Sequence, residues 1–380
     1  MRALVVGDRF LRADVFAASL RTATAAHGLD PFDIEQLELP YPTPDRLPLP
    51  DSVDGADLRP MWEDPVEAIR RTEADLTADP TLREYSGPVD LLVPRIADVD
   101  VLLVHLAPLS RAAVQAAARL RAVGCARGGP VNINVASLSA RGIPLFNCPG
   151  RNSQAVAEFL IGAILSLTRN IARGAQELRR GYWRLDLYAH QRTGHELHGQ
   201  VCGLVGFGAV GRSFAPIARG FGLRLQIYDP YVGDAELAAQ GATRTPLDRL
   251  LATSNVVIVA ARLTAETRGL IGARELELLQ PEAILVNTAR AEIVDQAAMR
   301  EAVQRGQRAI VDVFSPEPPM RDDPLLTSDR VLLTPHIAGA SREAAQRGAD
   351  VAASSVVRYL TDGALDHCVN AQAVQRPSTP

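Results

Sequence analysis

The chain of 380 residues contains no lysine, because all 40 of its basic residues are arginine. This absence excludes chemistry that needs an ε-amino group, such as Schiff-base catalysis, and it excludes the lysine of a phosphate-binding P-loop. The formal net charge of −4 shows no excess of basic residues. Nucleic acid and anionic membrane surfaces are therefore not expected as partners.

Cysteine is scarce, and its four positions are scattered without a Cys-x-x-Cys pair. This pattern argues against a metal site or a disulfide framework and favours a reducing, cytoplasmic location. Long apolar runs are also missing: the run at 155–167 is interrupted by Glu158 and is typical of a buried helix. The first residues, MRALVVGDRF, resemble a β-strand rather than a signal peptide.

Short apolar runs alternate with helical segments along most of the chain, which predicts α/β architecture with parallel sheets. Before residue 150 the strand-like runs are RALVV, DIEQLEL, VLLVH, RAVGC and GIPLFN. After residue 180 they are VCGLV, LRLQIY, NVVIVA, AILVN, AIVDVF and VLLTPH. The second set fits a doubly wound nucleotide-binding sheet.

Two other segments have a distinct character. Residues 40–90 are rich in proline and acid, which predicts an extended stretch and a short exposed helix near 66–78. Residues 153–180 predict one long helix that is apolar over most of its circumference and must be buried on several sides.

A G-x-G-x-x-G motif of Gly206, Gly208 and Gly211 lies between the strand VCGLV and the next predicted helix. In a dinucleotide site these glycines permit a tight turn, close approach of the pyrophosphate and close helix packing, respectively. The helix N-terminus then offers N–H groups to the phosphates. Asp229 ends the following strand, 18 residues beyond Gly211, where a carboxylate binds ribose hydroxyls and repels a 2′-phosphate. The motif predicts NAD rather than NADP.

Three polar residues follow later strands: Arg290 after AILVNTA, Glu317 after AIVDVFSP and His336 after VLLTP. Ligands bind at the carboxyl ends of strands in open α/β sheets, so these side chains are expected to converge. Arg290 could bind the carboxylate and carbonyl oxygen of a 2-keto acid. His336 could donate the proton, and a carboxylate at Glu317 would raise the pKa of that imidazole and fix its tautomer.

The chain resembles the D-isomer-specific 2-hydroxyacid dehydrogenase family, in its phosphoglycerate dehydrogenase-like branch. The resemblance spans about 101–370 and is carried by TGHELHG, VCGLVGFGAVGR, YDPY, TAETRGLIG, LVNTARAEIVD, VDVFSPEPP and TPHIAGAS. It implies a discontinuous flavodoxin-like substrate domain, 1–149 completed by 339–380, and a Rossmann NAD domain at 150–338. It also implies an NAD-dependent enzyme acting on a small 2-keto or 2-hydroxy acid, and a homodimer in which the helix at 155–172 lies at the interface.

The resemblance assigns the same roles to the three polar residues: substrate binding to Arg290, and an acid/base pair to Glu317 and His336. It implies further cofactor contacts at Ala209, Val210, Ala261, Thr288, Ala289, Arg290, Asp312 and Gly339. It places the substrate carboxylate against backbone N–H groups of a glycine loop, which in this chain is Arg127, Gly128 and Gly129.

The chain departs from the family pattern at several positions. Val131 and Asn134 stand where the family has Asp, Ala291 replaces the Gly after NTAR, and Arg262 enters a segment close to the cofactor. Arg127 and Arg151 flank the expected substrate mouth and predict a substrate with a second anionic or polyhydroxylated end. A short-form phosphoglycerate dehydrogenase-like enzyme, an NAD(H)-sensing binding protein and a degenerate paralogue without turnover remain as alternatives.

Overall fold

The computed structural model describes residues 1–39 and 79–374. The chain divides into two compact units: unit 1 comprises Met1–Arg151 and Ser341–Pro380, and unit 2 comprises Asn152–Ala340. The boundaries expected from the sequence, 149/150 and 338/339, each lie two residues from a unit boundary. Most of the proline-rich segment predicted at 40–90, including the helix expected at 66–78, falls outside the described residues.

Unit 1 is built on a five-stranded parallel sheet with the order β2-β1-β3-β4-β5. Its strands are β1 Arg2–Gly7, β2 Asp33–Glu38, β3 Val101–Val104, β4 Ala122–Cys125 and β5 Leu145–Phe146. The order 2-1-3-4-5 is that of a flavodoxin-like sheet. Every residue of β3 is buried, as expected for a central strand covered on both faces.

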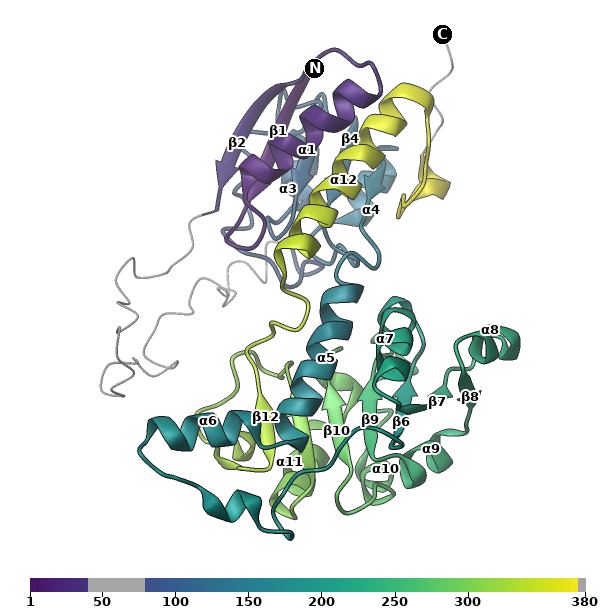
Figure 1. Cartoon of the computed structure of the whole chain (residues 1–380). Coiled ribbons are helices and arrows are strands. Elements are labelled where there is room, and N and C mark those ends of the chain that lie inside the picture. Colours follow the sequence, from purple (N-terminus) through teal and green to yellow (C-terminus); the bar gives the residue numbers. More distant parts are fainter. Residues whose placement is uncertain (40–78, 375–380) are drawn as a thin grey trace. The chain divides into compact units, whose positions relative to one another are not determined.

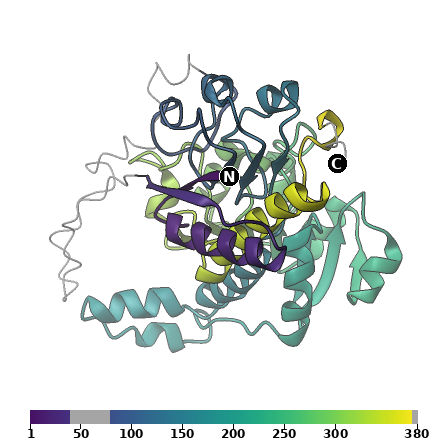
Figure 2. The ribbon, with the colours of Figure 1, turned by 90° about the horizontal axis from the view of Figure 1, so that it is seen from above.

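Helices cover both faces of the unit 1 sheet. They are α1 Ala13–Ala26, α3 Arg111–Ala116, α4 Val135–Ala140 and α12 Arg342–Asp362. Alternate β1 residues face opposite ways: Ala3 and Val5 join the core beneath α1 and α12, and Leu4 and Val6 join the core of α3 and α4. Helices α1 and α12, from the two ends of the chain, lie side by side in both views (Figures 1 and 2).

Unit 2 is built on a seven-stranded parallel sheet with the order β12-β11-β10-β9-β6-β7-β8. Its strands are β6 Val201–Val205, β7 Arg224–Tyr228, β8 Ala242–Arg244, β9 Val256–Val259, β10 Ile284–Asn287, β11 Arg308–Val311 and β12 Val331–Leu333. Counted from β6, the order is that of a doubly wound dinucleotide-binding sheet with one strand added, and the chain reverses direction across the sheet between β6 and β9. The predicted α/β fold class with two doubly wound parallel sheets is confirmed.

The unit 2 helices also form two layers. They are α5 Ser153–Thr168, α6 Ile171–Arg179, α7 Ala209–Gly220, α8 Asp234–Ala239, α9 Leu247–Thr253, α10 Ala273–Glu277 and α11 Gln296–Gln304. One core includes buried residues of α5 and α7, and the other includes buried residues of α9, α10 and α11. The polar residues singled out above follow strands of this sheet at its carboxyl edge.

The prediction of one continuous helix over 153–180 is wrong. Asn170 adopts a left-handed backbone conformation with φ of 55°, and α5 and α6 meet there at a bend of 63°. Asparagine tolerates this conformation better than most residues, because its short side chain can bond locally. Among the described residues, no single helix is long and apolar enough to cross a membrane, although α5 and α6 together meet the length and composition criteria.

Candidate active site

Three neighbouring strands of unit 2 end beside one another at the carboxyl edge of the sheet. Arg290 follows β10, Asp312 comes directly after β11, and His336 follows β12. These strands are adjacent and parallel, so their carboxyl ends share one edge. Glu317 reaches the same place from the loop that leaves β11.

His336 and Glu317 form a hydrogen-bonded pair. The Nδ1 atom of His336 lies 2.9 Å from Oε2 of Glu317, and the backbone N–H of Phe314 donates to the other carboxylate oxygen at 2.9 Å. Because Nδ1 donates to the Glu317 carboxylate, the Nε2 atom remains available to another hydrogen-bond partner. The two side chains are 42% and 39% exposed, so a ligand has access to the pair.

Glu317 also sets the protonation of His336. The hydrogen bond to Glu317 raises the pKa of the His336 imidazole, and this effect outweighs burial, which lowers it. The charge of Glu317 adds to the increase, whereas the nearby positive charge of Arg290 opposes it. The pair is therefore suited to hold a proton near neutral pH and to release it to a basic oxygen.

The backbone of His336 is left-handed, with φ of 54°, which is uncommon outside glycine. The fully buried carboxylate of Asp312 stabilises this turn. It accepts hydrogen bonds from the Thr334 hydroxyl at 2.6 Å and from the backbone N–H groups of Ile337 and Ala338 at 2.8 and 2.9 Å. The sequence indicated Asp312 only as a cofactor contact, and its position directly after an apolar strand was the available signal for this second role.

Arg290 lies in a turn that Asn287 holds. The buried Asn287 side chain donates to the Arg290 carbonyl at 3.0 Å and accepts from the Ala289 N–H at 3.1 Å. The Arg290 guanidinium donates to the Ala289 carbonyl at 2.7 Å. Thr288, Ala289 and Arg290 are all half-buried in this turn, and the sequence analysis did not identify Asn287 as its brace.

The glycine motif of unit 2 forms an open cradle between β6 and α7. Gly206 has φ of +96°, and a Cβ atom there would lie 2.6 Å from the backbone N of Ala261, so only glycine fits. Gly208 has open space where its Cβ would be. At Gly211 a Cβ would lie 2.8 Å from the Phe207 ring. The cradle therefore leaves room for a ligand to approach the backbone at Gly208.

The N-terminus of α7 faces this cradle, and Ala209 and Val210 are its first two residues. Asp229, which follows β7, accepts from the N–H groups of Phe207 at 2.7 Å and Tyr231 at 2.8 Å. Its carboxylate is thereby fixed beside the cradle, with further lone pairs for hydroxyl donors. These residues fit an adenine dinucleotide by the chemistry of their donors and acceptors.

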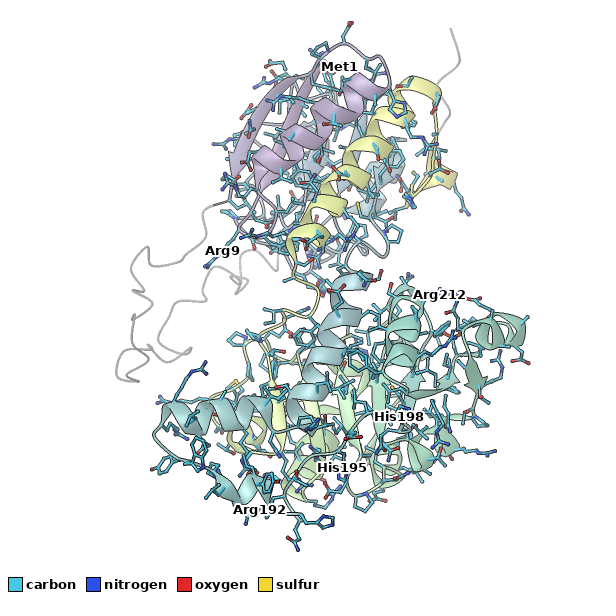
Figure 3. All side chains as sticks on the ribbon, in the orientation of Figure 1. Met1, Arg9, Arg192, His195, His198 and Arg212 are labelled. Atoms are coloured by element: carbon cyan, nitrogen blue, oxygen red, sulfur yellow. The ribbon has the colours of Figure 1, made fainter. Side chains whose placement is uncertain are left out.

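Two further positions near the cradle are constrained by packing. A Cβ at Gly339 would lie 2.3 Å from the Asn152 amide nitrogen, so this glycine permits a close approach. Arg212 on α7 (Figure 3) donates a hydrogen bond to Glu236 at 2.6 Å, and its guanidinium lies 5.5 Å from the centroid of the Phe207 ring. Glu236 and the Phe207 ring therefore hold the Arg212 side chain in place.

The predicted substrate residues lie at the carboxyl edge of the unit 1 sheet. Arg127 is bonded to the Glu84 carboxylate and, at 2.7 Å, to the Glu84 carbonyl. Gly128 and Gly129 are exposed, and within residues 1–39 and 79–374 no acceptor pairs with their backbone N–H groups. Two adjacent N–H groups of this kind can receive an anion. Arg151 makes different contacts, which are described below.

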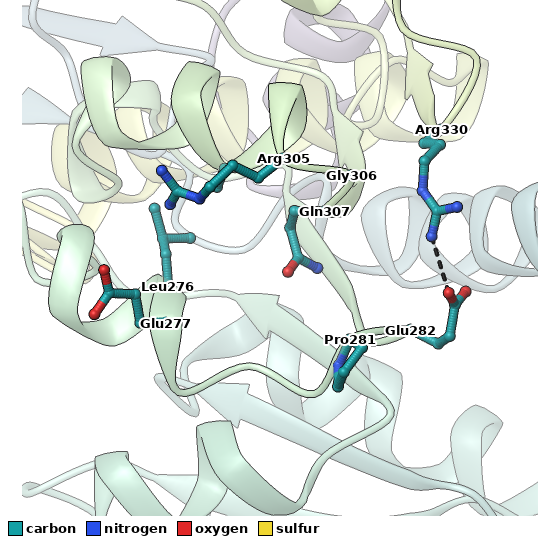
Figure 4. Close-up of a pocket in the computed structure, with 9 residues that line it drawn as sticks. Leu276, Glu277, Pro281, Glu282, Arg305, Gly306, Gln307 and Arg330 are labelled. Atoms are coloured by element: carbon teal, nitrogen blue, oxygen red, sulfur yellow. Dashed lines mark hydrogen bonds and ion pairs between the residues drawn. The ribbon is translucent and has the colours of Figure 1, made fainter.

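The surface hollow shown in Figure 4 lies elsewhere. Its volume is about 360 Å³, and its lining includes Glu282, Gln307 and Arg330. These residues precede β10, β11 and β12, so the hollow is at the amino edge of the sheet, whereas the glycine motif, Arg290 and His336 follow strand ends. Among the described residues, no group of three or more His, Cys, Asp or Glu side chains is arranged to hold a metal ion.

Comparison with known proteins places the chain in a family. Residues 161–338 match the model described as D-isomer specific 2-hydroxyacid dehydrogenase, NAD binding domain. A glyoxylate reductase of Korarchaeum cryptofilum is 31% identical over 82% of this chain and 95% of its own length. A D-3-phosphoglycerate dehydrogenase of Methanocaldococcus jannaschii is 32% identical over 84% of this chain, which spans 59% of that protein.

Solved structures share the fold. D-lactate dehydrogenase of Escherichia coli superposes with a TM-score of 0.70 at 19% identity, covering 97% of this chain and all of the other. An NAD⁺-bound 3-phosphoglycerate dehydrogenase of Entamoeba histolytica gives 0.66 at 21% identity, covering 97% and 98%. The chain belongs to the D-isomer specific 2-hydroxyacid dehydrogenase family. It is an NAD-dependent enzyme of this family, with an NAD-binding domain in unit 2.

Proposed function

We propose that the chain interconverts a 2-keto acid and a D-2-hydroxy acid with NAD, and that Arg290, Glu317 and His336 are its catalytic residues. The observation that carries this proposal is the 2.9 Å hydrogen bond between His336 and Glu317 in the NAD-binding unit. His336 follows β12 and Arg290 follows β10, and only β11 lies between these two strands in the sheet. An acid/base pair with a raised imidazole pKa and a nearby guanidinium matches the needs of carbonyl reduction.

Reduction of a 2-keto acid adds a hydride to the carbonyl carbon and a proton to the carbonyl oxygen. NADH supplies the hydride when it is bound. His336 donates the proton from Nε2, and Glu317 stabilises the imidazolium before the transfer and fixes its orientation throughout. In the reverse direction the neutral imidazole accepts the hydroxyl proton as hydride leaves the carbon.

Arg290 has two tasks in this mechanism. Its planar guanidinium can donate two parallel hydrogen bonds, which fits the carboxylate and the adjacent carbonyl oxygen of a 2-keto acid. It also stabilises the negative charge that develops on the carbonyl oxygen as hydride arrives. The Asn287 contacts hold the turn from which Arg290 projects.

The cofactor proposal uses the cradle of Gly206, Gly208 and Gly211. The N–H groups at Ala209 and Val210 would bind the pyrophosphate, and Asp229 would accept from the adenosine ribose. The remaining predicted contacts are Ala261, Thr288, Ala289, Asp312 and Gly339. The binding of the substrate carboxylate at Arg127, Gly128 and Gly129 of unit 1 stays a prediction.

Replacing Glu317 by glutamine is expected to change the pH profile of keto acid reduction. The carboxylate raises the pKa of His336, so its removal lowers that pKa. Reduction needs the protonated imidazole, and activity falls as pH rises through the pKa. The falling limb of kcat/KM should therefore move to lower pH in Glu317→Gln, as measured by NADH oxidation across a pH series.

The Glu343→Gln variant serves as the control, because Glu343 is an exposed residue in the first turn of α12 in unit 1. Its profile should match that of the unchanged chain. If the falling limb of kcat/KM in Glu317→Gln stays at the same pH, or moves to higher pH, Glu317 does not set the protonation of the catalytic acid.

We also propose that the chain forms a homodimer through the α6 region of unit 2. The apolar side chains of α5 are largely buried within the unit, whereas the segment from 171 to 188 exposes several large ones. They are Ile171, Leu178, Tyr182, Trp183, Leu185 and Tyr188, with 55–91% exposure. Exposed apolar residues grouped in this way are typical of a protein interface.

The dimer is tested by replacing Trp183, which is 75% exposed. Trp183→Glu places a charge at the centre of the segment and should convert the dimer to a monomer of 40.8 kDa. Light scattering coupled to gel filtration measures the mass. Phe221→Glu, at an exposed residue after α7, is the control. A monomeric unchanged chain, or a Trp183→Glu variant that stays dimeric, would contradict the proposal.

A further inference from the structure

A second set of polar side chains lies at the carboxyl edge of the sheet in unit 1, the unit that does not contain the residues proposed for acid/base chemistry. Asp8 follows β1, His105 follows β3, and Arg151 closes the turn after β5. The His105 ring bridges the other two: its Nδ1 lies 2.8 Å from Asp8 Oδ2, and its Nε2 lies 3.1 Å from Arg151 Nη2. Asp8 and His105 are almost fully buried, at 3% and 5% exposure.

These contacts define where the ring proton of His105 resides. An arginine N–H can only donate, so Nε2 of His105 accepts from Arg151 and the ring proton resides on Nδ1, which donates to Asp8. Burial lowers the pKa of His105, and the charges of Arg151 and Arg127 lower it further, although Asp8 opposes this. Burial raises the pKa of Asp8, but hydrogen bonds from His105 and two backbone N–H groups lower it overall.

Other contacts fix the Arg151 guanidinium. It lies 5.1 Å from the centroid of the Phe10 ring and donates to the Ala344 carbonyl at 3.4 Å. Gly348 of α12 makes room for it, because a Cβ there would lie 3.0 Å from Arg151 Cδ. The same Cβ would also lie 3.3 Å from the Ala126 Cβ, so the glycine in α12 permits close packing against both Arg151 and Ala126.

Arg151 differs from Arg127 in its charge balance. Arg127 is paired with Glu84, whereas no carboxylate in the described part of the chain forms an ion pair with Arg151. Asp8 lies on the far side of the imidazole. The described residues accept from two of the five guanidinium N–H groups of Arg151, which leaves donors for a planar or tetrahedral anion.

The exposed glycine loop is hydrogen-bonded to the turn that carries Arg151 in unit 1. The Cys148 N–H donates to the Arg127 carbonyl at 2.8 Å, and the Asn147 side chain donates to the Gly128 carbonyl at 2.8 Å. These bonds tie the loop of Arg127 and Gly128 to the turn that carries Arg151. An anion nest and a preorganised guanidinium therefore share one edge of one sheet.

We propose that Arg151 binds a second anionic group of the substrate, a carboxylate or a phosphate, and that His105 and Asp8 are positioning residues that hold its guanidinium. The proposal rests on the proposed function insofar as the anion is part of a 2-keto acid. The binding site itself belongs to unit 1 and is tested separately from turnover.

Kinetics with matched substrate pairs form the first test. One pair is 2-ketoglutarate and 2-ketovalerate, which differ by a terminal carboxylate, and the other is hydroxypyruvate phosphate and hydroxypyruvate. Arg151→Gln should lower kcat/KM by roughly 10- to 150-fold for the member of the preferred pair that carries the second anionic group, and leave the member without it within about threefold. The affected pair distinguishes a carboxylate from a phosphate. Equal changes for both members of each pair, or no change, would overturn the proposal.

The positioning role is tested with two variants of His105. His105→Leu removes the acceptor for Arg151 and should raise KM for the keto acid with the second anionic group, with little change in kcat for the keto acid without it. In His105→Gln the amide can accept from Arg151 and donate to Asp8, so this variant should recover part of the lost affinity. Equal behaviour of the two variants would assign His105 a purely structural role and refute that part of the proposal.

Calorimetric binding to the full chain distinguishes failure of this site from failure of the proposed function. Malonate and inorganic phosphate are the probes, and Arg121→Gln, an exposed arginine at the amino edge of the same sheet, is the control. At least one probe should have the same affinity for the unchanged chain and for Arg121→Gln. Its affinity for Arg151→Gln should be at least tenfold lower. If no 2-keto acid is reduced, this result still supports the anion site. Binding that is absent, or unchanged in Arg151→Gln, refutes it.

Discussion

His336→Asn is expected to lower kcat for keto acid reduction by about 100- to 10,000-fold, the range that a positioned general acid contributes. Asparagine cannot deliver a proton near neutral pH, although it can occupy a similar volume and tolerates the left-handed backbone that His336 adopts, with φ of 54°. NADH binding should be retained, because the glycine cradle is unchanged. Steady-state NADH oxidation and fluorescence titration of NADH measure the two quantities.

The control for this variant is His195→Asn, which replaces an exposed histidine between α6 and β6 in the same unit (Figure 3). Its kcat should equal that of the unchanged chain. If His336→Asn retains kcat within about tenfold while His195→Asn is unaffected, His336 is not the proton donor, since the loss falls below the lower limit for a general acid.

Arg290→Gln should produce the second large loss. Truncating one partner of a desolvated, hydrogen-bonded charge pair costs about 2–5 kcal/mol, which corresponds to a fall of roughly 30- to 4,000-fold in kcat/KM for the keto acid. Both kcat and KM should change, because in the proposed mechanism the guanidinium binds the carboxylate and also stabilises the carbonyl oxygen in the transition state.

Arg290→Lys refines this prediction. Lysine keeps the positive charge but lacks the planar fork that binds two oxygens at once, so it should recover only part of the activity. Arg305→Gln, at the amino edge of the same sheet, is the control and should have no effect on kcat/KM. Full activity in both Arg290 variants would exclude Arg290 from substrate binding.

The fold could be predicted from the sequence where strands are apolar and buried. All six strands predicted after residue 180 are present, but β8 was missed, because its residues, Ala242–Arg244, are few, polar and largely exposed at the sheet edge. The break at Asn170 was missed for a different reason. The apolar pattern continues across 153–180, and only the local conformation of one residue interrupts the helix.

The site could be predicted less completely than the fold. Spacing after apolar strands indicated Arg290, Glu317 and His336, the residues that we propose for catalysis. The residues that hold them, Asn287 and Asp312, were not identified as braces, because their bonds go to backbone groups of loops whose conformation no sequence pattern specifies.

The same limit applies to unit 1. Asp8 and His105 each follow an apolar strand, which was the signal that could have identified them. Their contact joins residues 97 positions apart, and sequence spacing does not reveal which strands are neighbours. The difference between Arg127, which is paired with Glu84, and Arg151, which has no such ion pair in the described residues, also required the structure.

The measurement that tests the central claim most directly is NADH oxidation by the purified full chain against a panel of 2-keto acids, with the chirality of the product determined. The panel comprises glyoxylate, hydroxypyruvate and its phosphate, 2-ketoglutarate, 2-ketovalerate and sugar-derived keto acids. The account predicts that at least one of them is reduced, that a chiral product is the D-2-hydroxy acid, and that His336→Asn abolishes the reaction. Binding of NADH without reduction of any panel member, or reduction that is as fast in His336→Asn, would contradict it.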